Sequence, residues 1–172
     1  MTMTEFKKEN DGSISIHQTD EENKKWHEEF YARQERKKKG FKESVKPQIM
    51  KILKDMKIDR VEIYYSGSGD DGSMEDATFY VGKDTINLNE KHIVDIGERK
   101  YWCHTDHTYK YTTDPMDLKD YIEEMAYDYL EAFHGGWEIN EGQSGNIIFD
   151  VIQNKIEHDY VTYVEHSERE EI

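Results

Sequence analysis

The sequence has a single cysteine and no long apolar segment. Because a disulfide needs two thiols, Cys103 cannot form one within the chain, which is typical of proteins in a reducing compartment. No stretch approaches the roughly 20 apolar residues of a membrane-spanning helix, and residues 1–10 lack the apolar part of a signal peptide. We therefore expect a cytoplasmic protein, in the host cytoplasm if a phage encodes it, with no membrane partner.

Hydrophobic residues are also scarce, at 35% of the chain, but aromatic residues make up 12%. Disordered chains are poor in aromatics, so this composition favours a folded core with polar extensions. A chain of 172 residues fits one domain and an appended arm. We divide it into an N-terminal helical arm, residues 1–57, and an acidic α+β domain, residues 58–172.

Basic residues are outnumbered, with 23 Lys and Arg against 38 Asp and Glu and a net charge of -15. The excess is local: residues 1–57 hold 14 basic and 11 acidic side chains, whereas residues 58–172 hold 9 and 27. Such a domain repels nucleic-acid phosphates, so we expect no direct nucleic-acid binding by it and a basic host protein or nucleoprotein complex as partner. Solubility alone explains the same charge equally well.

Three segments have the spacing of amphipathic helices. The first runs from Asp20 to Lys39, carries a thin aromatic stripe and is expected to end at Gly40. The second begins near Ser44 and packs on the core through apolar residues three and four apart. The third is the clearest, with Asp114 as N-cap and Pro115 at the first helical position. Its inward residues are expected to be Leu118, Ile122, Met125, Tyr129 and Phe133.

Alternation with a period of two predicts a β-hairpin whose strands are residues 60–65 and 77–81. Shorter strands are expected at residues 85–88, 93–96, 100–112, 137–139, 146–151 and 155–165. Together these elements predict an α+β fold, in which an antiparallel β-sheet packs against one long capped helix, with helices added at the N-terminus.

The loop between the hairpin strands, residues 66–76, holds four carboxylates and three glycines where two turn residues would suffice. Carboxylate oxygens suit Mg²⁺ or Ca²⁺, but the loop lacks the complete calcium-binding pattern. We predict that Asp70, Asp71, Glu75 and Asp76 bind a partner without a cofactor. A Mg²⁺ or Ca²⁺ site on the same four residues is one alternative, and a solvated turn is another.

A second cluster contains Cys103, His104, Asp106 and His107. Neighbouring residues of a strand point to opposite faces, and no second ligand pair with zinc-site spacing follows. We therefore predict no metal at this cluster, and no nucleophilic cysteine in so acidic a domain.

The turn after the third helix combines a double glycine, Gly135–Gly136, with aromatic and polar side chains. Such a rigid turn suits a binding site, although a helix cap and a core tryptophan would explain the same residues. The binding residues predicted here and on the neighbouring strand are His134, Trp137, Glu138, Asn140, Glu141 and Asp150.

Three motifs in order carry a family resemblance: residues 67–76, residues 122–138, and residues 140–150. Over about residues 60–166 the sequence resembles DUF6878, a domain family of unknown function from phages and bacteria. The loop of that family usually reads Gly-Asp-Ser-Gly, so Asp71 replaces a small residue here, and Glu141 stands where Asp is common. The resemblance implies a fold and a site region but no reaction.

We favour a non-enzymatic, acidic interaction protein of phage or mobile-element type. It would bind and inhibit a basic, nucleic-acid-binding host defence protein, with nucleic-acid mimicry of the anti-CRISPR kind as one mechanism. The alternative is a metal-assisted hydrolase built on the hairpin loop, with Glu138, Asp150 and His134 as helpers. A small dimer with a helical docking arm also stays open. Convergence of the hairpin tip and residues 134–142 in one pocket favours the enzyme, whereas acid spread over the surface favours the interaction protein.

Overall fold

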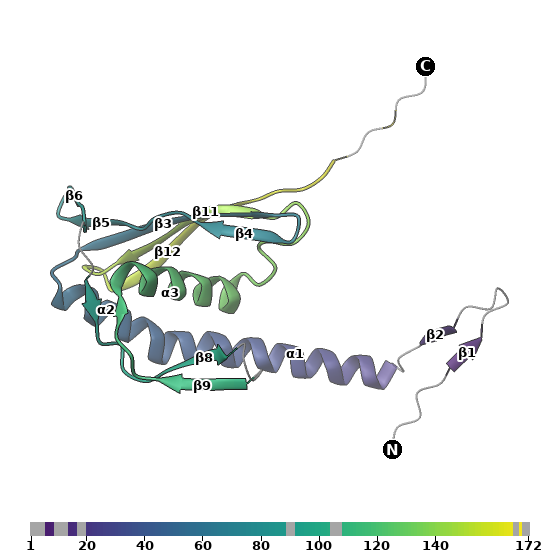
Figure 1. The fold of residues 1–172 in the computed structure, drawn as a ribbon. Coiled ribbons are helices and arrows are strands. Elements are labelled where there is room, and N and C mark those ends of the chain that lie inside the picture. Colours follow the sequence, from purple (N-terminus) through teal and green to yellow (C-terminus); the bar gives the residue numbers. More distant parts are fainter. Residues whose placement is uncertain are drawn as a thin grey trace. The chain divides into compact units, whose positions relative to one another are not determined.

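The computed structural model describes residues 6–8, 14–16, 20–88, 92–103, 108–166 and 169. The chain forms two compact units, Met1–Lys39 and Gly40–Ile172 (Figure 1). The sequence analysis divided the chain at residue 57, whereas these units meet between residues 39 and 40. Residues 41–55 belong to the second unit because Phe41, Ile49 and Leu53 are buried there.

The first unit contains a short antiparallel pair, β1 (Phe6–Lys8) and β2 (Ile14–Ile16), and the helix α1 (Asp20–Gly40). The α-helix ends at Gly40, as predicted, but Gly40 is not a left-handed cap and the chain stays helical beyond it. Gly40 has right-handed helical angles, φ -57° and ψ -45°, and the chain continues through a π-helical turn, η1 (Phe41–Val45), into α2 (Lys46–Asp55). Phe41 packs edge-on against Tyr129 and Phe133, so burial of the next side chain outweighs the glycine.

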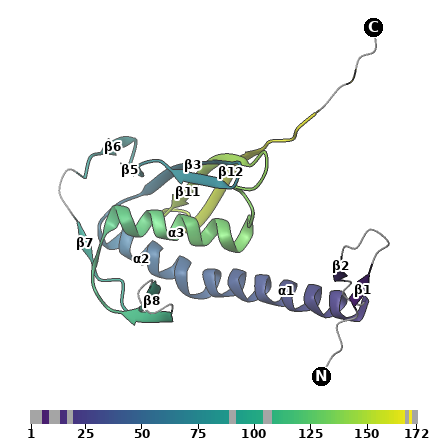
Figure 2. The ribbon, with the colours of Figure 1, turned by 45° about the vertical axis from the view of Figure 1, so that its right-hand side comes forward.

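The second unit is built on an antiparallel sheet, and the predicted α+β class is confirmed. Its strand order is β12 (Lys155–Thr162), β11 (Gln143–Asp150), β3 (Arg60–Ser68), β5 (Thr78–Val81) and β6 (Asp84–Ile86). The capped helix α3 (Leu118–Phe133) lies along one face of this sheet in both views (Figures 1 and 2). The core between the layers includes Ile63, Phe79, Ile122, Ile147 and Phe149, all nearly inaccessible to solvent.

The predicted acidic loop is itself a hairpin. Strand β3 continues to Ser68, and β4 (Asp71–Met74) pairs back along its second half, while β5 pairs with its first half. The turn between β3 and β4 consists of Gly69 and Asp70, whose φ angles are 63° and 69°. Two positive φ values are the requirement of a type I′ turn, which matches the twist of the flanking strands. The prediction of a long insertion between the hairpin strands is therefore wrong, because a two-residue turn lies at the tip.

The predicted cap of α3 is three residues too early. Asp117, not Asp114, caps the helix, and its Oδ1 accepts a hydrogen bond of 3.0 Å from the Lys119 amide. Met116–Asp117 (β10) pair with Ile93–Val94 (β7), which holds the chain extended until the helix starts. The apolar stripe is confirmed for Leu118, Ile122 and Met125, which are buried, while Tyr129 and Phe133 are half-buried.

The remaining strands differ in detail from the prediction. The segment 100–112 is two strands, β8 (Arg99–Cys103) and β9 (Thr108–Thr112), paired with each other. His104, Asp106 and His107 lie outside the described residues. The strand predicted at 137–139 is a turn, and β11 begins at Gln143. Among the described helices, none is long and apolar enough to cross a membrane.

Candidate functional site

The hairpin tip and the turn after α3 are joined by backbone hydrogen bonds. The Gly69 amide donates to the Asn140 carbonyl at 2.7 Å, and the Asp70 amide donates to the Glu138 carbonyl at 3.0 Å. The close approach is visible where the loop from α3 to β11 passes the end of β4 (Figure 1). We call residues 68–76 and 138–142 together the acidic tip.

Trp137 lies beneath the acidic tip. A Cβ added at Gly72 would stand 2.3 Å from the indole Cη2, and one added at Gly67 would stand 2.8 Å from Cε3. These two glycines therefore let the hairpin lie directly on the indole ring, which is buried. The edge of Tyr65 meets the same ring at 5.2 Å and 89°. Trp137 thus supports the tip from inside rather than presenting its face to solvent.

The predicted hairpin carboxylates all point to solvent. Asp70, Asp71, Glu75 and Asp76 are exposed, and so are Asn140 and Glu141 on the adjoining turn. Asp71 Oδ1 accepts a local bond of 2.8 Å from the Gly72 amide. Within the part of the chain that the structure describes, no three His, Cys, Asp or Glu side chains could share a metal ion.

Two other predicted residues are placed differently. Asp150 lies opposite Arg60, at the far end of β3 from the tip, and its Oδ1 accepts from the Gln153 amide at 2.7 Å. Asp150 therefore closes the β11–β12 turn and takes no part in the tip. Glu138 is half-buried, and its Oε2 is enclosed without a hydrogen-bond partner among the described residues.

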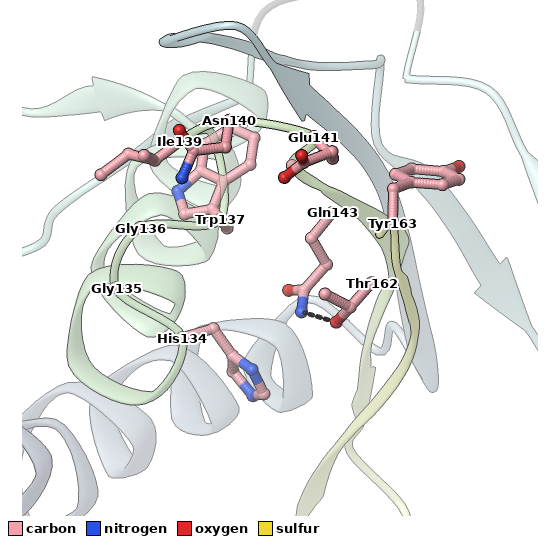
Figure 3. Close-up of a pocket in the computed structure, with 11 residues that line it drawn as sticks. His134, Gly135, Gly136, Trp137, Ile139, Asn140, Glu141, Gln143, Thr162 and Tyr163 are labelled. Carbon is pink, nitrogen blue, oxygen red and sulfur yellow. Dashed lines mark hydrogen bonds between the residues drawn. The ribbon is translucent and has the colours of Figure 1, made fainter. Parts of the chain in front are cut away.

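A pocket of about 240 Å³ opens beside the acidic tip. It is lined by residues 134–137, 139–143, 162 and 163 (Figure 3). Glu141 supplies the single carboxylate of this lining, because the hairpin acids lie outside it. The two predicted segments thus converge through their backbones, while their carboxylates do not share the pocket.

The wall of the pocket leads to a partly buried polar chain that the sequence analysis did not predict. His134 Nε2 lies 2.9 Å from His158 Nδ1, and His158 Nε2 lies 2.8 Å from Tyr65 Oη. Tyr65 Oη donates to Gln143 Oε1 at 2.6 Å, and Gln143 Nε2 donates to Thr162 Oγ1 at 3.0 Å. His134, Gln143 and Thr162 are the three members of this chain that line the pocket as well (Figure 3).

The donors and acceptors of this chain follow from one bond. A tyrosine hydroxyl has a single hydrogen, and Tyr65 gives it to Gln143. His158 Nε2 must therefore donate to Tyr65, which leaves His158 Nδ1 as acceptor of the hydrogen on His134 Nε2. Nδ1 of His134 is then the basic atom at the end of the chain. The arrangement can take up or release a proton at that atom.

Burial disfavours the charged forms of the three ionisable members of the chain, His134, His158 and Tyr65. Desolvation, followed by repulsion from His134, lowers the pKa of His158 to about 4. Desolvation also lowers the pKa of His134 and raises that of Tyr65, because burial disfavours each charged form.

The sequence did contain a sign of this chain. Ile156, His158 and Tyr160 follow one another at every second position of β12, so their side chains lie on the same face of the strand. A histidine therefore shares that face with an isoleucine that packs against the core. The contact between Tyr65 and His158 can be located only when the register of three strands is known. Tyr65 pairs with Gly145 of β11, and Gly145 pairs with Tyr160 of β12. The Tyr65 hydroxyl thus reaches His158 across the intervening strand, at the level of Gly145.

The comparisons with known proteins give a family. DUF6878, a family of unknown function, matches residues 41–171. The chain belongs to this family. The DUF6878 match begins at residue 41, so it includes α2, which the resemblance over about 60–166 left out. No curated protein and no solved structure matches the chain. Both the acidic tip and the polar chain lie within the DUF6878 region.

Proposed function

We propose that this DUF6878 protein is an acidic interaction module that binds a basic surface of a protein partner. The acidic tip carries the proposal, because five exposed carboxylates stand on two segments that are hydrogen-bonded to each other. They are Asp70, Asp71, Glu75, Asp76 and Glu141. A surface that is already ordered loses little conformational entropy on binding.

The distribution of charge supports a basic partner. Residues 40–172 contain 14 Lys and Arg against 29 Asp and Glu, a net charge of -15, whereas residues 1–39 contain nine of each. A field of one sign speeds encounter with a surface of the opposite sign and excludes polyanions. The partner class that fits is a basic, nucleic-acid-binding protein of a host, whose phosphate-binding groove the carboxylates would occupy. Inhibition of a defence complex is the biological form of this proposal.

The test compares two variants of equal charge. One neutralises the five tip acids with Asn or Gln, and the control neutralises five exposed acids elsewhere: Asp84, Glu98, Asp114, Glu123 and Glu165. Binding is measured to single purified nucleic-acid-binding proteins of the host, first selected by retention on heparin, at low and high salt. We expect the tip variant to lose at least tenfold in affinity, about 1.4 kcal/mol, and the control to lose much less. Equal losses would show that only total charge matters.

A hydrolase is the second candidate, and the pocket wall is what favours it. Burial lowers the pKa of His134 and so favours the neutral imidazole, which offers a basic nitrogen as general acid–base catalysis requires. The metal-assisted form has less support, since the hairpin carboxylates do not meet in the pocket. Turnover of activated esters and phosphodiesters, with and without Mg²⁺, by the wild type but not by His134→Ala would favour this candidate over the first.

A further inference from the structure

Strand β12 forms one edge of the sheet and leaves its outer side open. Within the described part of the chain, no strand pairs with that side. β12 pairs with β11 over all eight of its residues without a bulge, and its sequence contains no proline. Proteins usually protect an exposed edge with a short strand, a proline or a bulge. The opposite edge follows this rule, since β6 has three residues, but β12 does not.

The register shows which backbone groups of β12 face outward. The Tyr163 amide donates to the Gly142 carbonyl, on the β11 side, at 3.1 Å. Because bonding directions alternate along an antiparallel strand, the odd-numbered residues of β12 face β11. The N–H and C=O groups that point away from the sheet are those of Ile156, His158, Tyr160 and Thr162. Such a row of donors and acceptors binds an extended chain as a further strand.

The side chains beside this edge favour a basic strand. Ile156 and His158 lie on the α3 side of the sheet, so the odd-numbered residues of β12 lie on the other side. Asp159 on that side is exposed, and its carboxylate has no ion-pair partner among the described residues, whereas Glu157 is held by Lys155 at 2.6 Å. A lysine or arginine opposite Asp159 would therefore meet a free carboxylate. The second unit, with 14 basic and 29 acidic residues, attracts such a strand and opposes a second copy of the chain.

A pocket of about 200 Å³ lies at the same margin of the sheet, on the α3 side. It is lined by Phe41, Lys42, Lys46, Tyr129, Phe133 and Ile156. Its single strand residue is Ile156 of β12, and the Lys42 ammonium lies 5.6 Å from the centre of the Phe133 ring. An added strand directs every second side chain to this side. The aromatic and aliphatic walls suit an apolar side chain there, and the two lysines repel a basic one.

We propose that the outer edge of β12 accepts an extended segment of the basic partner as an added strand, in which basic and apolar residues alternate. The basic residues would lie beside Asp159, and the apolar ones would lie on the pocket side. For the charge of the partner this inference rests on the proposed function, but its site is not the acidic tip. Backbone hydrogen bonds would supply affinity, and the two faces would select the sequence. The strand would also cover Tyr160 and Val161, which are 51% and 59% exposed.

The probe is a synthetic peptide as long as β12, with lysine and valine in alternation, and a glutamate–valine peptide is the control. Amide hydrogen exchange of the full chain is measured with each peptide. We expect the lysine peptide to slow exchange at the outward amides of β12, and the glutamate peptide to leave them unchanged. Asp159→Lys should weaken binding of the lysine peptide about fivefold, and Glu98→Lys, an equal change of charge at an exposed site outside the sheet, should weaken it less. Unchanged exchange at β12 with the lysine peptide would overturn the proposal.

Two N-methylated forms of the lysine peptide test the backbone contact. Methylation of every valine removes the amide donors from one edge of the extended peptide, and methylation of every lysine removes them from the other edge. One form should bind and the other should not, because only one edge of the peptide faces β12. Equal affinities of the two forms would show that no added strand is formed.

The variant that lacks the five tip acids separates this site from the proposed function. In that variant the lysine peptide should still slow exchange at β12. If the peptide protects the tip instead and loses its affinity in that variant, the strand site is wrong and the tip proposal stands. If the peptide protects β12 but the tip acids do not affect binding of the host protein, the tip proposal fails and the strand site stands. Slower exchange at the outward amides of the wild type alone, as its concentration rises, would assign the edge to a second copy and overturn the proposal.

Discussion

Acidification should destabilise the second unit through His158. The loss of stability should begin near pH 6.5, which is above the pH at which most carboxylates titrate. The pKa of His158 falls from 6.5 to about 4 on folding, because the ring is desolvated and lies against His134. The unfolded chain therefore binds the proton more tightly than the folded chain. The associated stability is fully present above about pH 6.5 and is lost as the pH falls towards about 4.

The size of this effect follows from the shift. One pKa unit corresponds to about 1.4 kcal/mol, so the largest loss that His158 can cause is near 3 kcal/mol. The ring keeps partial contact with solvent, and we therefore expect about 1–2 kcal/mol. His134 acts in the same direction, since burial lowers its pKa too.

Urea unfolding at several pH values between 7.5 and 4.5 measures the effect, with fluorescence as the probe in a Trp26→Phe, Trp102→Phe background, where Trp137 is the one remaining tryptophan. The reference is His158→Gln, whose amide can donate and accept within the chain but does not titrate. The stability difference between wild type and this variant should shrink by about 1–2 kcal/mol across the range. His166→Gln serves as the control, because His166 is exposed. A difference that stays constant from pH 7 to 4.5 would refute the reasoning.

Three further outcomes follow from the packing. Gly72→Ala should cost about 1–3 kcal/mol because its methyl group would collide with Trp137, and the cost should fall in a Trp137→Leu background; equal costs in both backgrounds would show that the indole is not the obstacle. Leu118→Ala should cost about 2–5 kcal/mol in chemical denaturation because the side chain is fully buried, and a change near zero would misplace the core face of α3. Removal of residues 1–39 should preserve a single cooperative melting transition, since the buried cluster of the second unit lies wholly after them.

The helix α3 shows what local pattern could and could not predict. Its apolar spacing located Leu118, Ile122 and Met125 correctly, because a helix against a sheet needs one apolar face. Its start was wrong because Asp114–Pro115 satisfies the same local preferences as Asp117. The choice between them is made by the pairing of Met116 with Val94, a tertiary contact that no local pattern contains.

The candidate site, too, was predicted only in part. The acidic segment could be located from composition alone. Asp70 and Glu75 are exposed, and exposed carboxylates need contact with solvent rather than a particular packing partner. The polar chain escaped prediction because Tyr65 and His158 are 93 residues apart and meet across an intervening strand. Only the register of three strands brings them together, and register is a property of the whole sheet.

The central position of β3 has a consequence for synthesis. Strand β3 is synthesised early, but its neighbour β11 follows much later. Asp150, which pairs with Arg60, lies ninety residues further along the chain. At roughly 5–20 residues per second the strand spends several seconds beside the ribosome with one edge unpaired. The hairpin to β4 and β5 covers only the opposite edge of β3, so the edge that β11 will take stays open during that interval. A stalled or prematurely ended chain would expose the middle of its sheet, which is the part most prone to pair with other molecules.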